Sequence, residues 1–280
     1  MSYLDLVVEA ITFPSVNQCI YCGTFVGPLS DEHIIPYGLG GRLVLQKASC
    51  ISCAEITSKF ERSCLRTMLG AVRIHLNLSS RRKGKRPSKL DVNFDSHEDN
   101  KIQSVEVINH PDILTMIEFP PPKVLGRTGG IPQGKIRVHV SNYQGNTQER
   151  INRLRKNVII NKIIPTSDFC RLLAKIAHSY SIALLGNNSF EPTLLDIILG
   201  KNTDFFDFIG GPDEITQLSI DKSQLHQISI SYIYNHLNQT LPPIINAEIY
   251  LFSFLNMPLY QVIVGKSYKS LPKPLQSSGQ

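Results

Sequence analysis

The sequence predicts an α+β fold, in which a small cysteine-bearing module precedes a larger domain of largely antiparallel strands around one long helix. Two observations support this division. Four of the six cysteines form two Cys-x-x-Cys pairs within residues 19–53. Beyond residue 100, strand-like runs surround a single strongly periodic helical segment, which is typical of a mixed domain. We therefore expect a module at 1–78, a basic and then acidic linker at 79–100, and an α+β domain at 101–280.

The segment between and after the cysteine pairs predicts a strand, a turn, a second strand and a helix. The run HIIP predicts a short strand that ends at Pro36, because proline cannot donate to a β ladder. The glycines of YGLGG predict a turn, and RLVLQ predicts the returning strand. One long helix is expected over Cys50–Leu76, where apolar residues recur at nearly helical spacing. Together these elements form a ββα unit.

One long helix is also expected in the larger domain. Thr166–Leu185 carries an apolar stripe at helical spacing, with Ser167 as its N-cap. Arg171, Lys175 and His178 fall on the other side, which predicts that they face solvent. The remaining elements are a short helix over Leu194–Leu199 and the strands IQSVEVI, ILTMIEF, KIRVHVSNY, HQISISYIYNHL, IINAEIYLFSFL and LYQVIVG, of which the last three are expected to pair antiparallel.

Composition and charge narrow the class of protein. The chain has 280 residues, 42% of them hydrophobic, and no run of eighteen apolar residues. The N-terminus lacks the basic start of a secretory signal, so a cytoplasmic protein without a membrane span is expected. The formal net charge of +6 lies entirely in the first third of the chain. Residues 1–90 contain 12 Lys or Arg and 6 Asp or Glu, whereas residues 91–280 contain 17 of each.

Much of this positive charge lies in the run SSRRKGKRPSK. Such a run neutralises phosphates and releases counterions, which attracts nucleic acid regardless of its sequence. A solvated basic linker without a partner is the alternative. The residues expected to contact nucleic acid are Arg81, Arg82, Lys83, Lys85 and Arg86.

Cys19, Cys22, Cys50 and Cys53 have the number and local spacing of a structural zinc site with four thiolate ligands. In a reducing compartment such pairs favour a metal over disulfides. The ion would stabilise the fold directly, because a small ββα unit has little core of its own. A redox pair, an iron–sulfur centre and metal-free buried thiols are the alternatives.

Between the cysteine pairs, Glu32 and His33 are the candidate catalytic residues. Hydrolysis of a phosphodiester requires a base that activates water and a divalent cation near the phosphate. Glu32 is expected to bind Mg²⁺ or Mn²⁺, and His33 to act as the base. Neighbouring side chains on a strand point to opposite faces, so both can reach one phosphate only from an irregular strand segment. The preceding Asp31 is expected to cap a turn.

The runs CIYCG, SDEHIIPYGLGG, LVL and CISC, in this order, resemble the HNH endonuclease family in its zinc-stapled branch. The resemblance covers about residues 19–76. It implies a ββα-metal fold in which Glu32 binds the catalytic metal and His33 is the general base. Two positions depart from the family pattern. Arg42 stands where the family has an asparagine that orients the histidine, and Ala54 stands where a third residue completes the metal site.

Glu61 is the favoured replacement for the missing ligand, since it lies about two helical turns after Ala54 on the same face. Glu55, adjacent to Ala54, is the alternative, and Arg42 is expected to bind a phosphate. These residues predict a metal-dependent HNH-type DNA endonuclease or nickase, with bacterial or phage defence as a setting by analogy. The alternative is a catalytically inactive zinc-ribbon module that binds nucleic acid or protein. The C-terminal domain is expected to recognise DNA, form a homodimer or bind a protein partner.

Overall fold

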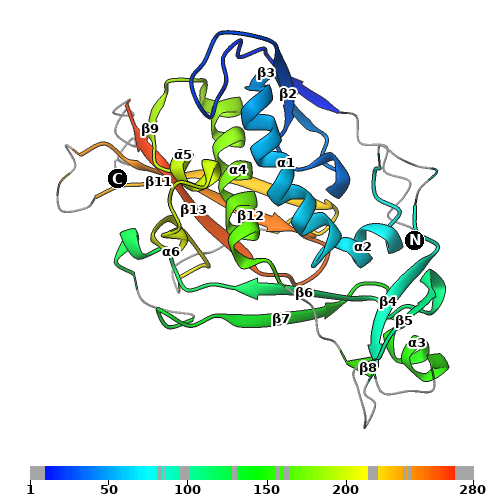
Figure 1. Ribbon diagram of the computed structural model, residues 1–280. Coiled ribbons are helices and arrows are strands. Elements are labelled where there is room, and N and C mark those ends of the chain that lie inside the picture. Colours follow the sequence, from blue (N-terminus) through cyan, green and yellow to red (C-terminus); the bar gives the residue numbers. More distant parts are fainter. Residues whose placement is uncertain are drawn as a thin grey trace, which may run out of the picture.

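The computed structural model shows a mixed α+β architecture with mostly antiparallel sheets (Figure 1). Helices α1 (Ile51–Arg66) and α4 (Thr166–Leu185) lie side by side. Among the helices of the described residues, none is both long enough and apolar enough to cross a bilayer. The structure describes residues 10–80, 84, 86–94, 101–127, 131–154, 158–159, 164–213, 220–235, 238 and 241–268.

The N-terminal part forms a three-stranded sheet followed by a helix. Strands β1 (Ile11–Phe13), β2 (Leu29–His33) and β3 (Leu43–Cys50) lie in the order β1-β3-β2, with β2 antiparallel and β1 parallel to β3. The strand predicted for the run HIIP is wrong, because β2 already ends at His33 and residues 34–36 lie outside any strand. The predicted glycine-rich turn is the 3-10 helix Tyr37–Leu39. Helix α1 begins directly after β3, so the expected order of strand, turn, strand and helix is observed.

The prediction of a single long helix over Cys50–Leu76 is wrong. Helix α1 ends at Arg66, and a second helix, α2 (Gly70–His75), begins after a three-residue turn. The break turns Met68 and Leu69 inward, where both are fully buried. The guanidinium of Arg73 spans it by donating to the Leu65 carbonyl at 2.9 Å. Burial of two large apolar side chains at this corner outweighs the local preference for a continuous helix.

The C-terminal part contains a five-stranded sheet in which every described pairing is antiparallel. The three predicted consecutive strands are confirmed, and they form neighbours in the order β13 (Leu259–Ser267), β12 (Ile244–Leu251) and β11 (His226–Ile233). Two short strands complete the sheet along β13. The strands are β9 (Phe190–Pro192), β10 (Ile209–Gly210), β11 (His226–Ile233), β12 (Ile244–Leu251) and β13 (Leu259–Ser267).

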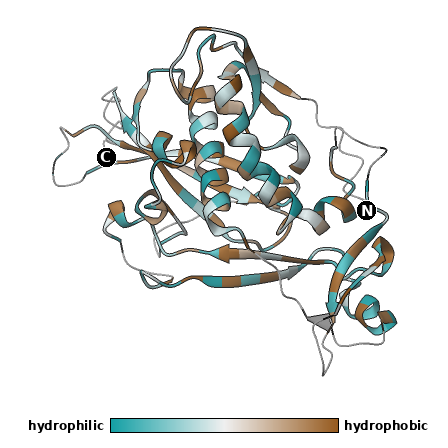
Figure 2. Ribbon diagram, viewed as in Figure 1, coloured by the Kyte–Doolittle hydropathy of each residue, from teal (hydrophilic) through white to brown (hydrophobic). Residues whose placement is uncertain are grey.

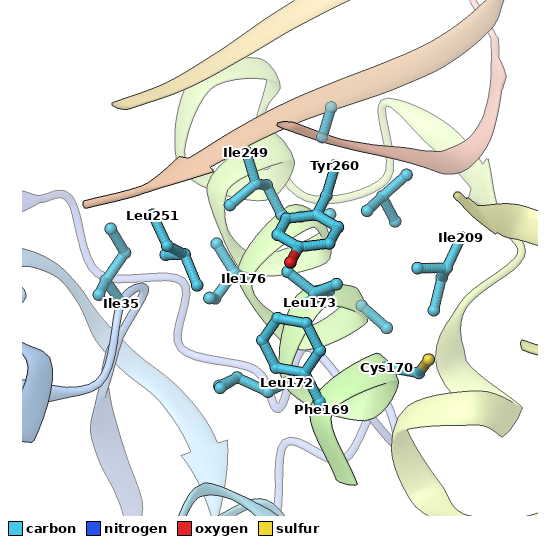
Figure 3. Packing of buried hydrophobic residues seen from close by; sticks show 14 of the residues in the cluster. Ile35, Phe169, Cys170, Leu172, Leu173, Ile176, Ile209, Ile249, Leu251 and Tyr260 are labelled. Carbon is cyan, nitrogen blue, oxygen red and sulfur yellow. The ribbon is translucent and has the colours of Figure 1, made fainter. Parts of the chain in front are cut away.

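Helix α4 has the bounds that the sequence predicts, but its N-cap is Pro165 rather than Ser167. It packs on the sheet through its apolar stripe, and Figure 3 shows the rings of Phe169 and Tyr260 meeting between the two layers. The two ring centroids are 5.3 Å apart in an edge-to-face arrangement, the favoured geometry for aromatic pairs. The short helix predicted nearby is confirmed as α5 (Leu195–Leu199).

The remaining elements surround this centre. They are β4 (Lys89–Phe94), β5 (Lys101–Glu106), β6 (Ile113–Glu118), β7 (Arg137–Asn142), α3 (Thr147–Leu154), β8 (Val158–Ile159) and α6 (Phe205–Phe208). Figure 2 shows hydrophobic and hydrophilic bands alternating along the β6–β7 hairpin, in which β6 is buried and β7 is largely exposed. Strand β4 pairs with β5 and β8, although it lies within the segment expected to be a linker.

The hydrophobic core is continuous across the predicted boundary between the two domains. One cluster of buried residues includes Ile34, Leu39 and Phe60 from the N-terminal part together with Leu173 and Val264 from the C-terminal part. The division into domains stays a prediction. The shared core means, however, that α4 is positioned to contribute side chains to the N-terminal module.

Candidate functional site

The four cysteines of the two Cys-x-x-Cys pairs come together at one point. Cys19 and Cys22 lie in a turn closed by the bond from the Gly23 amide to the Cys19 carbonyl, at 2.9 Å. Cys50 is the last residue of β3, and Cys53 lies in the first turn of α1. The four sulfur atoms all lie within 4.8 Å of one another. The end of the sheet and the start of the helix thus meet at this cluster.

The spacing of these sulfur atoms fits a zinc ion. Zn–S bonds of about 2.3 Å place the corners of a tetrahedron about 3.8 Å apart. The Sγ atoms of Cys22 and Cys50 are 3.7 Å apart. All six cysteines are free thiols, and burial raises the pKa of the Cys53 thiol, so metal binding has to release a proton there. The cluster can hold a metal ion and is compatible with structural zinc.

Asp31 lies at an irregularity in the β2–β3 ladder. The register shifts between Ser30 and Glu32, and the opposing Lys47 has a positive φ of 47°. The Lys47 amide donates to the Asp31 carboxylate at 3.0 Å, so this side chain stabilises the bulge as a turn cap would. Bulges re-aim the side chains that follow them. The irregular strand segment required by the sequence argument is therefore present directly before Glu32.

Glu32 points into the interior and meets a residue that the sequence analysis did not assign to the site. Glu32 is only 6% exposed, and its Oε1 atom lies 2.6 Å from the Nζ atom of Lys175 on α4. The same Nζ lies 2.9 Å from Oε1 of Glu61 on α1. Lys175 has no exposed surface. Two carboxylates from β2 and α1 thus converge on one buried ammonium.

Backbone carbonyl groups complete the surroundings of this ammonium. Lys175 Nζ donates to the carbonyl oxygen of His33 and, at 3.3 Å, to that of Ile34. Burial disfavours the charged amine, but the two carboxylates outweigh it and raise the pKa of Lys175. Burial also raises the pKa of Glu32, and the ammonium offsets part of that rise. Lys175 is therefore charged at neutral pH.

The imidazole of His33 is half-buried and packs against Tyr37, with ring centroids 5.5 Å apart. Glu55 is exposed on α1, so of the two proposed replacements only Glu61 joins Glu32. Arg42 is exposed directly before β3. The catalytic roles assigned to His33, Glu32, Arg42, Glu61 and Glu55 stay predictions.

The expected catalytic Mg²⁺ or Mn²⁺ does not fit between these carboxylates as the chain is folded. The point on which Glu32 and Glu61 converge is held by Lys175. Within the described ranges, the four cysteines are the one cluster in which three or more Cys, His, Asp or Glu side chains approach closely enough to share an ion. No catalytic step through a divalent cation can be derived from this geometry.

The predicted nucleic-acid contacts are only partly within the described residues. Arg81, Arg82, Lys83 and Lys85 lie outside them. Arg86 is half-buried, and its guanidinium donates to the Leu78 carbonyl. A different basic surface is visible on α1, where Lys59, Arg62 and Arg66 are all exposed. These three residues, here named the α1 ridge, recur at spacings of three and four and so share one helix face.

The prediction that Arg171, Lys175 and His178 face solvent is wrong. Lys175 is fully buried, His178 is 2% exposed and Arg171 is half-buried. The reason is that the N-terminal part of the chain covers the polar side of α4. Glu61 of α1 contacts Lys175, and the ring of Phe60 on the same helix packs against Arg171. His178 interacts with the Ile20 carbonyl at 2.8 Å, and burial lowers the pKa of its imidazole to about 4.

A signal for this burial is visible in the sequence of α4. Its polar side carries the small residues Ser179 and Ser181 beside the ionisable ones, and both are fully buried. A helix that faces water usually carries long charged side chains there. The sequence analysis also did not assign Tyr21 to the site. Tyr21 is buried beside Glu32, and burial together with the negative charge of Glu32 raises the pKa of its hydroxyl group.

Comparison of the chain with protein-family models, with curated proteins and with solved structures finds no match. The HNH resemblance stays a prediction that rests on the motif residues alone.

Proposed function

We propose that this chain is a zinc-stapled nucleic-acid-binding protein that uses an HNH-like carboxylate pair for structure rather than for cleavage. One observation carries the proposal. The Lys175 ammonium, without exposed surface, lies 2.6 Å from Glu32 and 2.9 Å from Glu61, the carboxylates expected to hold a catalytic cation. An ion pair so placed stabilises the packing of α4 against the module and leaves Glu32 unable to bind a substrate-bound metal.

Charge supports nucleic acid as the partner. The whole net charge of +6 lies in residues 1–90, the part that contains the cysteine cluster. The α1 ridge presents three cations on one exposed helix face. Cations so arranged bind phosphates of double-stranded DNA without reading its sequence. The basic run at 81–86 adds charge next to this module in the chain.

A second candidate function is the metal-dependent endonuclease predicted from the motif. It is favoured by the proximity of Glu32 and Glu61, two oxygen donors from a strand and a helix, but it requires the Lys175 ammonium to leave the point between them before a divalent cation binds. His33 directly follows Glu32 in the chain. Cleavage of DNA that depends on both His33 and an added divalent cation would favour this candidate over the first.

Binding is tested by fluorescence anisotropy with a double-stranded DNA oligonucleotide across a salt series. The full chain is compared with a variant in which Lys59, Arg62 and Arg66 are all changed to Gln. We expect the variant to bind more weakly. The slope of log K against the logarithm of the salt concentration should decrease in magnitude by about 2–3, since each phosphate contact contributes about 0.9 to it.

A matched control removes the same charge elsewhere. Lys123, Lys135 and Arg137 are exposed residues on or near the β6–β7 hairpin, and their triple change to Gln is expected to leave the slope nearly unchanged. An equal loss in both variants would mean that net charge alone attracts DNA and that the α1 ridge is not the contact surface. Absence of salt-sensitive DNA binding by the unaltered chain would refute the proposed function.

A further inference from the structure

Four oxygen atoms of the N-terminal module surround the Nζ atom of Lys175. Two belong to the carboxylates of Glu32 and Glu61, and two are the backbone carbonyl oxygens of His33 and Ile34. All four come from β2, the residues just after it, and α1, whereas the cation comes from α4. The site therefore consists of an oxygen cage from one part of the chain and a positive charge from another.

The composition of this cage matches the preference of hard divalent cations. Mg²⁺, Mn²⁺ and Ca²⁺ take carboxylate and carbonyl oxygens as ligands. An ammonium has three donors and no acceptor, so it can satisfy several such oxygens but carries one charge only. The groups that face Lys175 are Glu32, Glu61 and, beside Glu32, Tyr21, which burial and the neighbouring carboxylates keep neutral.

Charge and space decide which cation this cage holds. The ammonium occupies the point on which the two carboxylates converge, and its positive charge repels a divalent cation that approaches the same oxygen atoms. Helix α4 is anchored on both sides of Lys175, since Ala174 and Ile176 are fully buried against the core. The helix is therefore fixed in place around Lys175, whose side chain has no exposed surface.

We infer that the Lys175 ammonium replaces the divalent cation between Glu32 and Glu61, so that the folded chain binds no divalent cation there. The corollary is a latent metal site: removal of the lysine charge leaves an oxygen cage with two negative charges, which a divalent cation can fill. The inference concerns this cage alone and does not depend on whether the chain binds nucleic acid.

The inference is tested with Mn²⁺ as the probe, by electron paramagnetic resonance of free Mn²⁺ during titration of the full chain loaded with zinc. The unaltered chain and its Glu32→Gln variant are expected to bind Mn²⁺ equally, because the cage binds none in either protein. Lys175→Ala, which removes both the charge and the atoms that lie between the two carboxylates, is expected to bind one Mn²⁺ at least tenfold more tightly than the unaltered chain. The matched control Lys175→Ala/Glu32→Gln is expected to lose that gain.

Two results would overturn the inference. One is Mn²⁺ binding by the unaltered chain that Glu32→Gln or Glu61→Gln abolishes, since the cage would then accept a metal beside the lysine. This comparison needs only unaltered Lys175, so it decides the question even where Lys175→Ala fails to fold. The other is a folded Lys175→Ala variant, verified by circular dichroism, that gains no Mn²⁺ binding.

Discussion

Replacement of Lys175 by Met is expected to destabilise the fold by about 3–5 kcal/mol, because breaking a buried ion pair leaves an uncompensated charge. The structure places this change at the upper part of that range. The lysine side chain is fully buried, and the side chains of its partners Glu32 and Glu61 are only 8% and 21% exposed. Methionine fills nearly the same volume, so the loss measures charge rather than packing.

The same reasoning predicts how the loss is repaired. The triple variant Lys175→Met/Glu32→Gln/Glu61→Gln removes all three charges and is expected to recover most of the stability. Urea unfolding of zinc-loaded protein at pH 7, followed by circular dichroism, measures each difference. The loss in Lys175→Met should also shrink as the pH falls. Burial raises the pKa of Glu32, and the variant lacks the ammonium that offsets part of that rise, so Glu32 takes up a proton more readily in its folded state.

Two outcomes would contradict this reasoning. A loss below about 1 kcal/mol in Lys175→Met would mean that the ammonium is not buried between the two carboxylates, since exposed pairs contribute that little. A triple variant no more stable than the single variant would mean that the loss comes from packing and not from unpaired charge.

Three further predictions concern other parts of the fold. Removing the metal with a chelator, or changing Cys50 to Ser, should lower Tm by about 10 °C or more, because the free energy of metal binding stabilises the folded state. Elemental analysis should find one zinc and no iron. An unchanged Tm would contradict a structural role of the metal. His178 and His226 have pKa values of about 4 in the fold through burial, below the unfolded value of about 6.5, so stability should fall as pH drops from 6.5 to 4, by about 3 kcal/mol for each. His178→Phe should flatten this pH dependence in urea unfolding, and an unchanged slope would show that His178 is not buried neutral. Phe169→Ala should cost about 3–5 kcal/mol, because the fully buried ring packs on Tyr260; a loss under 1 kcal/mol would contradict that packing.

Local patterns predict several elements well. The bounds of α4 and the antiparallel order of β11, β12 and β13 follow from the spacing of apolar residues and from turns between short runs. The cysteine cluster follows equally from two Cys-x-x-Cys pairs, because each pair places two thiols on one side of a tight turn. In these cases the decisive information lies within a few residues of the element.

Features that depend on distant residues are not visible in such patterns. The contact between Lys175 and the His33 carbonyl joins residues 142 positions apart, and nothing near Lys175 in the chain indicates that α1 covers it. The break before α2 likewise depends on where Met68 and Leu69 can be buried. Glu61 is an intermediate case, since helix periodicity places it toward the site but does not identify its partner.

Cleavage by Glu32 and His33 is measured by relaxation of supercoiled plasmid with added Mg²⁺ or Mn²⁺, comparing the unaltered chain with His33→Ala and Glu32→Gln purified in the same way. We expect all three preparations to leave the plasmid equally supercoiled while the unaltered chain still binds it. Nicking by the unaltered chain that both substitutions abolish would show that Glu32 serves catalysis despite its pairing with Lys175, and the structural role proposed for the carboxylate pair would then be wrong.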